Sequence, residues 1–174
     1  MAVPLWQWGL FDAAHATGPS RSDRQRPVRP LLPEPGDHNA RYLLIATGTG
    51  VTPYRSMLPL LATAMAERGV EVVLLQGART PEELLYSDDF YAFAAAHPGF
   101  RYVPCLSREL PANPHPDVRH GYVQQHLAEF APNPATDIAY LCGNPDMVDA
   151  IFEALKEAGL PTPQVRREKY VSSK

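Results

Sequence analysis

Residues 42–53, with the sequence YLLIATGTGVTP, constrain the fold of this chain more than any other stretch. An uninterrupted apolar run leads into a turn with two glycines, and a helical pattern begins at Thr52 and Pro53. A strand that is apolar on both faces is typical of a parallel sheet covered by helices. The stretch therefore predicts a buried parallel strand, a turn at its carboxyl end and a helix that starts in the turn.

The turn has the features of an anion-binding site. Gly48 and Gly50 permit positive φ angles and the close approach of a ligand. Thr52 is a good N-cap and Pro53 suits the first helical position, so amides at the start of the helix would face the turn. These amides and the helix dipole favour a phosphate group. The spacing G-x-G-x-x-P differs from the common dinucleotide fingerprint G-x-G-x-x-G, and a turn that needs glycine only for its shape is the alternative.

From residue 39 onward, strand-like and helix-like segments alternate. We expect strands at about residues 41–46, 70–76, 101–106, 138–142 and 164–170, and helices at about 53–68, 81–96, 123–130 and 145–158. A capping box at Thr80–Glu83 and a cap at Asn144 mark two of the helix starts. This alternation predicts an α/β fold with a five-stranded, doubly wound parallel sheet and helices on both faces. If the strand order is 3-2-1-4-5, the turns after the first and fourth strands share one ligand-binding crevice.

Residues 1–38 differ from this alternating region. Residues 18–37 contain five prolines and four arginines, so we expect an extended, poorly ordered lead-in before a single domain at residues 39–174. A net charge of −3 gives no indication of nucleic-acid binding, and no apolar run is long enough to span a membrane. The start is a poor signal peptide, which leaves the cytoplasm as the expected location. The two cysteines and the scattered histidines show no metal-site spacing.

Four motifs, taken in order, resemble the C-terminal nucleotide-binding domain of ferredoxin (or flavodoxin) NADP reductases. They are IATGTGVTPYRS at 45–56, LSRE with YVQ at 106–109 and 122–124, YLCGNPDMVD at 140–149 and REKYVSSK at the end of the chain. The ordered set is more specific than any single motif, and it covers about four fifths of the chain. The resemblance implies NADP(H) as the bound nucleotide.

The resemblance also implies a place for each part of the nucleotide. The G-T-G-x-x-P turn would receive the pyrophosphate and the nicotinamide side, and the Ser-Arg pair with the Tyr and Gln of Y-x-Q would surround the 2′-phosphate and adenine. An arginine fork suits a dianionic phosphate, and a tyrosine face suits adenine. The nucleotide-binding residues expected in this way are Thr47, Gly48, Thr49, Gly50, Pro53, Arg79, Ser107, Arg108, Tyr122, Gln124, Gly143, Asn144 and Met147. For Ser107, Arg108 and Arg79 the alternative is an ordinary solvated loop.

Three residues near the ends of the last two strands are implied to take part in the reaction. Cys142 would lie near the reacting nicotinamide and shape its encounter with the flavin, with no attack by a thiolate. Tyr170 would stack on the flavin, and Glu168 would assist the passage of protons and electrons. The alternatives are an apolar filler for Cys142, because free cysteine packs as a hydrophobe, and a surface charge for Glu168.

The family's reductases begin with a β-barrel that binds FAD, and neither of its motifs is found in this sequence. Hydride transfer from NADPH to a one-electron carrier needs a cofactor that accepts two electrons and releases them singly. We therefore expect the NADP(H)-binding half of a flavin-dependent reductase, with FAD on a missing domain or a separate chain, and with ferredoxin or flavodoxin as electron partner. A stand-alone or truncated nucleotide-binding module without turnover is the alternative.

Overall fold

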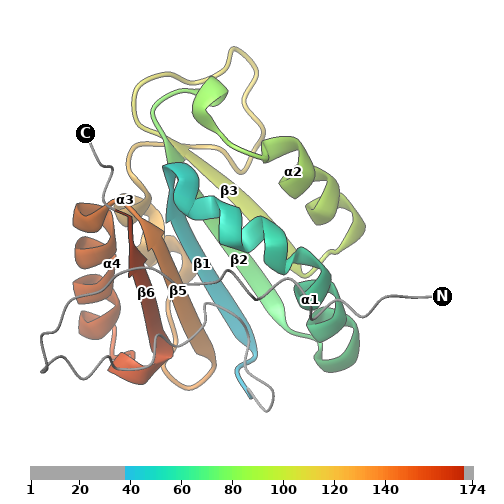
Figure 1. Cartoon of the computed structure of the whole chain (residues 1–174), viewed down its shortest axis with the longest axis vertical. Helices are drawn as coiled ribbons and strands as arrows, with labels where there is room; N and C mark the ends of the chain where they lie inside the picture. The colour runs from blue at the N-terminus through green and yellow to red at the C-terminus, as the bar shows by residue number, and fades with distance from the viewer. Residues whose placement is uncertain (1–37, 171–174) are drawn as a thin grey trace, which may run out of the picture.

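A parallel β-sheet forms the centre of the computed structural model, which describes residues 38–170 (Figure 1). Its strands are β1 (Arg41–Thr47), β2 (Glu71–Ala78), β3 (Phe100–Leu106), β4 (Arg119–His120), β5 (Asp137–Gly143) and β6 (Val165–Lys169). They lie in the order β4-β3-β2-β1-β5-β6, and every neighbouring pair is parallel. The five long strands therefore have the expected order 3-2-1-4-5.

The expectation of five strands was wrong by one, because β4 adds a sixth strand at the edge of the sheet. Arg119 aligns with Cys105 and His120 with Leu106 in this short pairing. Two residues at the end of a proline-rich loop are too few to show the alternation by which a strand is recognised in a sequence.

Helices cover both faces of the sheet (Figure 1). The α-helices are α1 (Thr52–Arg68), α2 (Ser87–Ala96), α3 (Val123–His126) and α4 (Pro145–Glu157). Short 3-10 segments are η1 (Gly48–Val51), η2 (Pro81–Glu83), η3 (Leu127–Phe130) and η4 (Thr162–Gln164). α1 and α2 pack on one face, and α3 and α4 pack on the other. This is the doubly wound arrangement that the sequence predicts.

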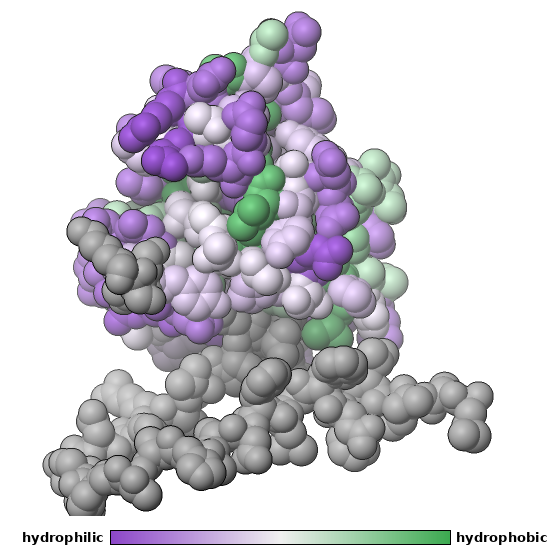
Figure 2. Space-filling model, turned by 45° about the horizontal axis from the view of Figure 1, so that its top comes forward, coloured by the Kyte–Doolittle hydropathy of each residue, from purple (hydrophilic) through white to green (hydrophobic). Residues whose placement is uncertain are grey.

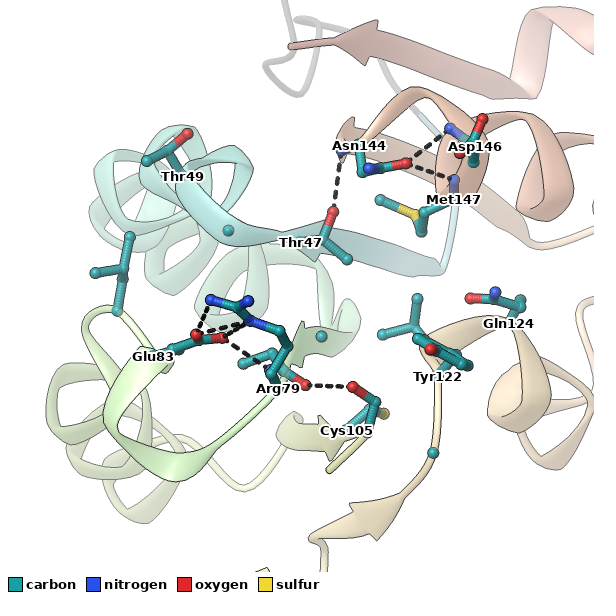
Figure 3. Close-up of a pocket in the computed structure, with 17 residues that line it drawn as sticks. Thr47, Thr49, Arg79, Glu83, Cys105, Tyr122, Gln124, Asn144, Asp146 and Met147 are labelled. Atoms are coloured by element: carbon teal, nitrogen blue, oxygen red, sulfur yellow. Dashed lines mark hydrogen bonds and ion pairs between the residues drawn. The ribbon is translucent and has the colours of Figure 1, made fainter. Parts of the chain in front are cut away.

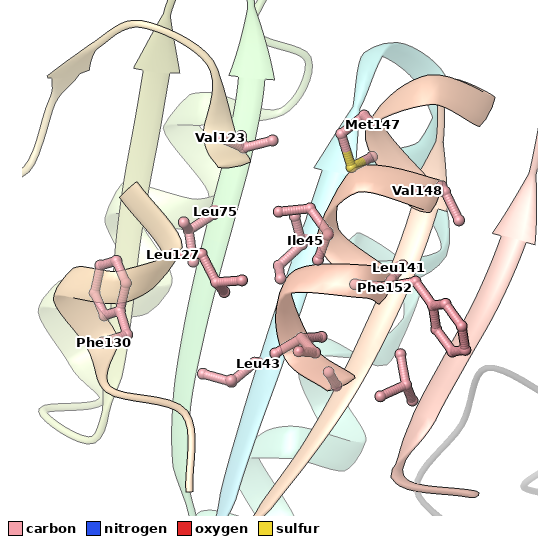
Figure 4. Packing of buried hydrophobic residues seen from close by; sticks show 14 of the residues in the cluster. Leu43, Ile45, Leu75, Val123, Leu127, Phe130, Leu141, Met147, Val148 and Phe152 are labelled. Carbon is pink, nitrogen blue, oxygen red and sulfur yellow. The ribbon is translucent and has the colours of Figure 1, made fainter. Parts of the chain in front are cut away.

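The two cores form because β1 is apolar on both sides, as expected. Leu43 and Ile45 point into the core beneath α3 and α4, where Figure 4 shows them among side chains from β2, β5 and α4. Tyr42, Leu44 and Ala46 point into the opposite core beneath α1 and α2. All five side chains are fully buried. The central strand is therefore fixed from both faces, which holds the turn at its carboxyl end in place.

Two of the three expected helix caps were wrong. Val51 occupies the N-cap position of α1 in place of Thr52, and no side chain caps this helix. Thr80 caps only the short η2, without a side-chain bond, and α2 begins four residues beyond Glu83, after Tyr86 with its positive φ of 59°. The Glu83 carboxylate instead accepts a hydrogen bond from the backbone of Arg79.

The expected lead-in at residues 1–38 lies almost entirely outside the described residues. Among the helices of residues 38–170, none combines the length and the apolar character needed to cross a membrane.

Candidate functional site

A cavity of about 630 Å³ opens at the carboxyl ends of β1, β2, β3 and β5 (Figure 3). Residues from six separate segments meet there, because parallel strands end at one edge of the sheet. In Figure 2, which turns this edge toward the viewer, a mainly polar surface surrounds a small apolar area. The crevice lies where the winding of the sheet reverses, between β1 and β5, as the strand order predicts.

Most of the expected nucleotide-binding residues line this cavity. They are Thr47, Gly48, Thr49, Arg79, Ser107, Tyr122, Gln124, Asn144 and Met147. Four others do not line the cavity: Gly50, Arg108 and Gly143 are chain neighbours of lining residues, and Pro53 lies four residues after Thr49. Sequence reasoning missed several lining residues, of which Glu83 and Asp146 carry charge. For Glu83 the sequence did offer a signal, because it follows Arg79 by four residues, a spacing at which opposite charges often pair.

The two glycines of the turn differ in what they require. Gly48 has a φ of 54°, and a Cβ added to it would meet nothing within 4 Å. Gly50 has no positive φ, and an added Cβ would lie 2.3 Å from the carbonyl oxygen of Cys142. The expected positive φ at Gly50 was therefore wrong. Gly50 allows the turn to pack on the backbone of β5, whereas Gly48 borders the cavity.

The turns after β1 and β5 are joined by hydrogen bonds. The backbone N–H of Asn144 donates to Oγ1 of Thr47 at 3.0 Å. The Oδ1 of Asn144 accepts from the backbone amides of Asp146, at 2.8 Å, and Met147, at 3.3 Å. The expected cap of α4 is confirmed, and it connects the first turn of α4 to the end of β1.

One end of the cavity carries an exposed aromatic ring. Tyr122 is 60% exposed, and it directly precedes α3. The backbone N–H of Tyr122 donates to Oε1 of Gln125 at 2.8 Å, which fixes the backbone that carries the ring. Gln124 lines the cavity next to it. A planar ring on a fixed backbone is suited to stacking against a base.

Arg79 and Glu83 form an ion pair at the rim of the same cavity (Figure 3). Hydrogen bonds from the Arg79 side chain and backbone hold the pKa of Glu83 below its usual range, and the same bonding raises the pKa of Arg79. The backbone N–H of Arg108 donates to the carbonyl oxygen of Arg79 at 3.0 Å, which places the backbone of Arg108 beside this pair. Ser107 donates its hydroxyl to the carbonyl oxygen of Ala78 at 3.4 Å.

The three residues expected to take part in the reaction lie together at the ends of β5 and β6. Glu168 is the register partner of Cys142, and the Tyr170 N–H donates to the carbonyl oxygen of Gly143 at 2.9 Å. Burial raises the pKa of Cys142 to about 11, and a hydrogen bond with Tyr170 opposes this shift. Burial and the same hydrogen bond raise the pKa of Tyr170 to about 12. Cys142 is therefore a buried, protonated thiol at neutral pH.

Tyr54 is a further buried residue at this end of the sheet that the sequence did not reveal. Its hydroxyl donates to the carbonyl oxygen of Tyr140 at 2.7 Å and contacts that of Ile45 at 3.2 Å. Burial raises the pKa of Tyr54 well above its ordinary value. Because β1 and β5 accept from one hydroxyl, Tyr54 ties together the two strands that flank the crevice.

Within residues 38–170, no group of three or more His, Cys, Asp or Glu side chains is placed to hold a metal ion.

Known proteins resemble this chain over the same region. A family model described as the oxidoreductase NAD-binding domain matches residues 44–153. The reductase subunit of an aromatic O-demethylase from Amycolatopsis is 34% identical over 167 residues, which are 92% of this chain and 46% of that protein. Ferredoxin–NADP reductase B from Sorangium cellulosum is 37% identical over 136 residues, covering 74% of this chain and 53% of that protein.

A solved structure is similar as well. The crystal structure of the Amycolatopsis reductase GcoB superposes with a TM-score of 0.63 and 34% identity, over 76% of this chain and 38% of that one. The chain thus spans about half, or less, of the length of these relatives.

Proposed function

The chain belongs to the oxidoreductase NAD-binding domain family of ferredoxin–NADP reductase-like enzymes, and from this premise we propose that it binds NADP(H) as the nucleotide-binding half of a flavin-dependent reductase. The observation that carries the proposal is the cavity at the reversal of the sheet, which is lined by residues of three expected motifs. Its volume of about 630 Å³ lies within the usual range for ligand sites, about 300–1,000 Å³.

The proposed orientation follows from the chemistry at each end of the cavity. The pyrophosphate would lie at Gly48 and Thr49, in the short η1 that leads into α1; no side chain caps α1, and its dipole favours an anion. The adenine would stack on the exposed ring of Tyr122. Ser107 and Arg108 would hold the 2′-phosphate, since a hydroxyl and a guanidinium suit a dianion. The nicotinamide would then lie toward the end of β5.

At the proposed nicotinamide end, a thiol, a phenol and one carboxylate lie together. Cys142 is protonated at neutral pH and fully buried, so its proposed role is to shape the contact between nicotinamide and flavin without forming a bond to either. Tyr170 lies over this end with 37% of its surface exposed. Glu168 is the acidic group of the cluster and is half-buried.

FAD is the cofactor that the family implies, and the described residues fit only part of it. The exposed ring of Tyr170 offers one face for stacking, but Tyr170 lines neither the main cavity nor the smaller one beside α2. Enclosed sites bury about 70–90% of a ligand, and one exposed ring falls far short of this. We therefore propose that a flavin, which would accept hydride and release single electrons, is held mainly by another domain or chain.

The electron partner is proposed from the relatives. They include a ferredoxin–NADP reductase and electron-transfer or reductase components of oxygenases, such as that of toluate 1,2-dioxygenase from Pseudomonas putida. We propose a ferredoxin, a flavodoxin or an oxygenase component as the final acceptor. Because the described residues give no enclosed flavin site, a nucleotide-binding module without turnover is the second candidate function.

Calorimetric titration of wild type and Arg108→Ala with NADP⁺ and NAD⁺ tests the proposal. A charge-assisted hydrogen bond contributes about 1.5–3 kcal/mol, so the variant should bind NADP⁺ about 10- to 100-fold more weakly. NAD⁺ binding should hardly change. Arg101→Ala is the matched control, because Arg101 is exposed at the opposite end of β3 and pairs with Asp117. Equal losses for both nucleotides would remove the phosphate role of Arg108, and absence of binding to wild type would contradict the function itself.

A further inference from the structure

Glu83 holds one edge of the Arg79 guanidinium at the rim of the cavity. The Nε of Arg79 donates to Oε1 at 2.8 Å and to Oε2 at 3.0 Å, and one terminal guanidinium nitrogen also donates to Oε1. The backbone N–H of Arg79 donates to Oε2 at 3.0 Å. One edge of the guanidinium fork, which suits bidentate contact with a phosphate, is therefore occupied by a carboxylate.

The pairing of Arg79 with Glu83 removes the positive charge that the cavity wall would offer to a phosphate. Among the described residues that line the cavity, Arg79 is the sole Arg or Lys, whereas Glu83 and Asp146 are both acidic. NADP and NAD differ only in the 2′-phosphate, which is a dianion at neutral pH. A carboxylate that neutralises the one cation of the cavity wall therefore weakens the binding of NADP and leaves the binding of NAD largely unchanged.

We infer that Glu83 is a specificity-determining residue that reduces the preference of this site for NADP over NAD by occupying the guanidinium of Arg79. The inference rests on the proposed function of the cavity. The side chains of Arg79 and Glu83 are 60% and 37% exposed, and such exposed pairs are held weakly. A 2′-phosphate can therefore compete for Arg79, and each NADP molecule that binds must displace Glu83 or be repelled by it.

Equilibrium titration of Glu83→Gln with NADP⁺ and NAD⁺ tests the inference. The variant keeps the shape of the side chain and removes its charge, so NADP⁺ should bind about 2- to 5-fold more tightly, and NAD⁺ should bind as in wild type. Glu82→Gln is the matched control. Glu82 is the neighbouring carboxylate, is hydrogen-bonded to Thr80 and does not line the cavity, so its variant should change neither affinity.

A double-mutant cycle isolates the role of Arg79. In an Arg79→Gln background, Glu83→Gln should no longer tighten NADP⁺ binding, since no guanidinium remains to be released. An equal gain in that background would overturn the inference in favour of general charge repulsion. A loss of NAD⁺ affinity in Glu83→Gln would overturn it in favour of a direct bond from Glu83 to the ribose hydroxyls.

The failure of this inference can be told apart from the failure of the proposed function. If wild type binds neither nucleotide, the cavity is not an NADP(H) site and both fail. If wild type binds NADP⁺ and Glu83→Gln binds it no more tightly, the site stands and the role of Glu83 is wrong.

Discussion

At the scale of single residues, the turn after β1 separates a folding requirement from a binding requirement. Gly50 lies against the backbone of β5, with no room for a Cβ beside the Cys142 carbonyl oxygen. Gly48 needs its positive φ of 54° but borders open space in the cavity. Both glycines stand out in the sequence, yet only the structure shows which of them borders the cavity.

Gly50→Ala should destabilise the fold by about 1–3 kcal/mol or more, because the new methyl group overlaps backbone atoms that cannot move aside. Gly48→Ala should cost about 1–2 kcal/mol, from its left-handed conformation alone. Urea denaturation of both variants measures the difference. A Gly50→Ala protein as stable as wild type would contradict the observed packing of the turn on β5.

The buried thiol of Cys142 should make the stability of the fold depend on pH. In the folded chain the pKa of Cys142 is raised from its ordinary value of 9.0 to about 11, by burial. Above pH 9 the unfolded chain loses this proton first, so it binds fewer protons than the folded chain and stability falls. The free energy of unfolding should therefore hold below about pH 9 and decline toward pH 11. Denaturation at several pH values should show a shallower decline in Cys142→Ala, and an identical slope would contradict the assignment.

At the scale of elements, α4 is fixed to the sheet through Asn144. Its side chain caps the helix, and its backbone N–H bonds to Thr47 at the end of β1. The sequence predicted this cap because Asn-Pro-Asp directly follows a buried strand. The capping box predicted at Thr80 was wrong, because Glu83, which was expected to complete it, is bonded to Arg79 instead. A local pattern predicts a helix start well only when no neighbouring charge competes for the capping side chain.

Asn144→Ala should lower the stability of the fold by about 1 kcal/mol, the usual cost of losing such a cap. Asn144→Asp retains an oxygen acceptor and should stay close to wild type in stability. Thermal or urea unfolding measures both. Equal destabilisation of the two variants would show that the Oδ1 bonds to the amides of Asp146 and Met147 do not hold the helix.

At the scale of the whole molecule, the sequence predicted the order of the long strands, and with it the edge of the sheet where the cavity opens. This strand order could be predicted from the alternation of apolar strands with amphipathic helices and from the glycine turn. The edge strand β4 and the pairing of Arg79 with Glu83 were not predictable, because each depends on contacts that periodicity does not encode. The path of the loop that carries Arg108 was likewise not predictable, because this loop has no periodic pattern.

The 174-residue chain should bind NADPH without oxidising it, because its described residues offer a flavin one exposed ring and no enclosure. The absorbance of NADPH, recorded over time with ferricyanide as acceptor and then after FAD is added, measures its oxidation. Turnover on adding free FAD alone would contradict the proposed need for a flavin-binding domain or chain.

The central claim is that NADP(H) lies across the carboxyl edge of the sheet, from the β5 turn to Tyr122. Mapping of backbone amide NMR shifts during titration of the intact chain with NADP⁺ tests it most directly. We predict that the largest changes fall at Gly48, Thr49, Arg79, Ser107, Tyr122, Gln124 and Asn144, whose segments surround one cavity. Changes confined to the smaller cavity between Leu84, Tyr91 and His115, or no saturable changes at all, would contradict it.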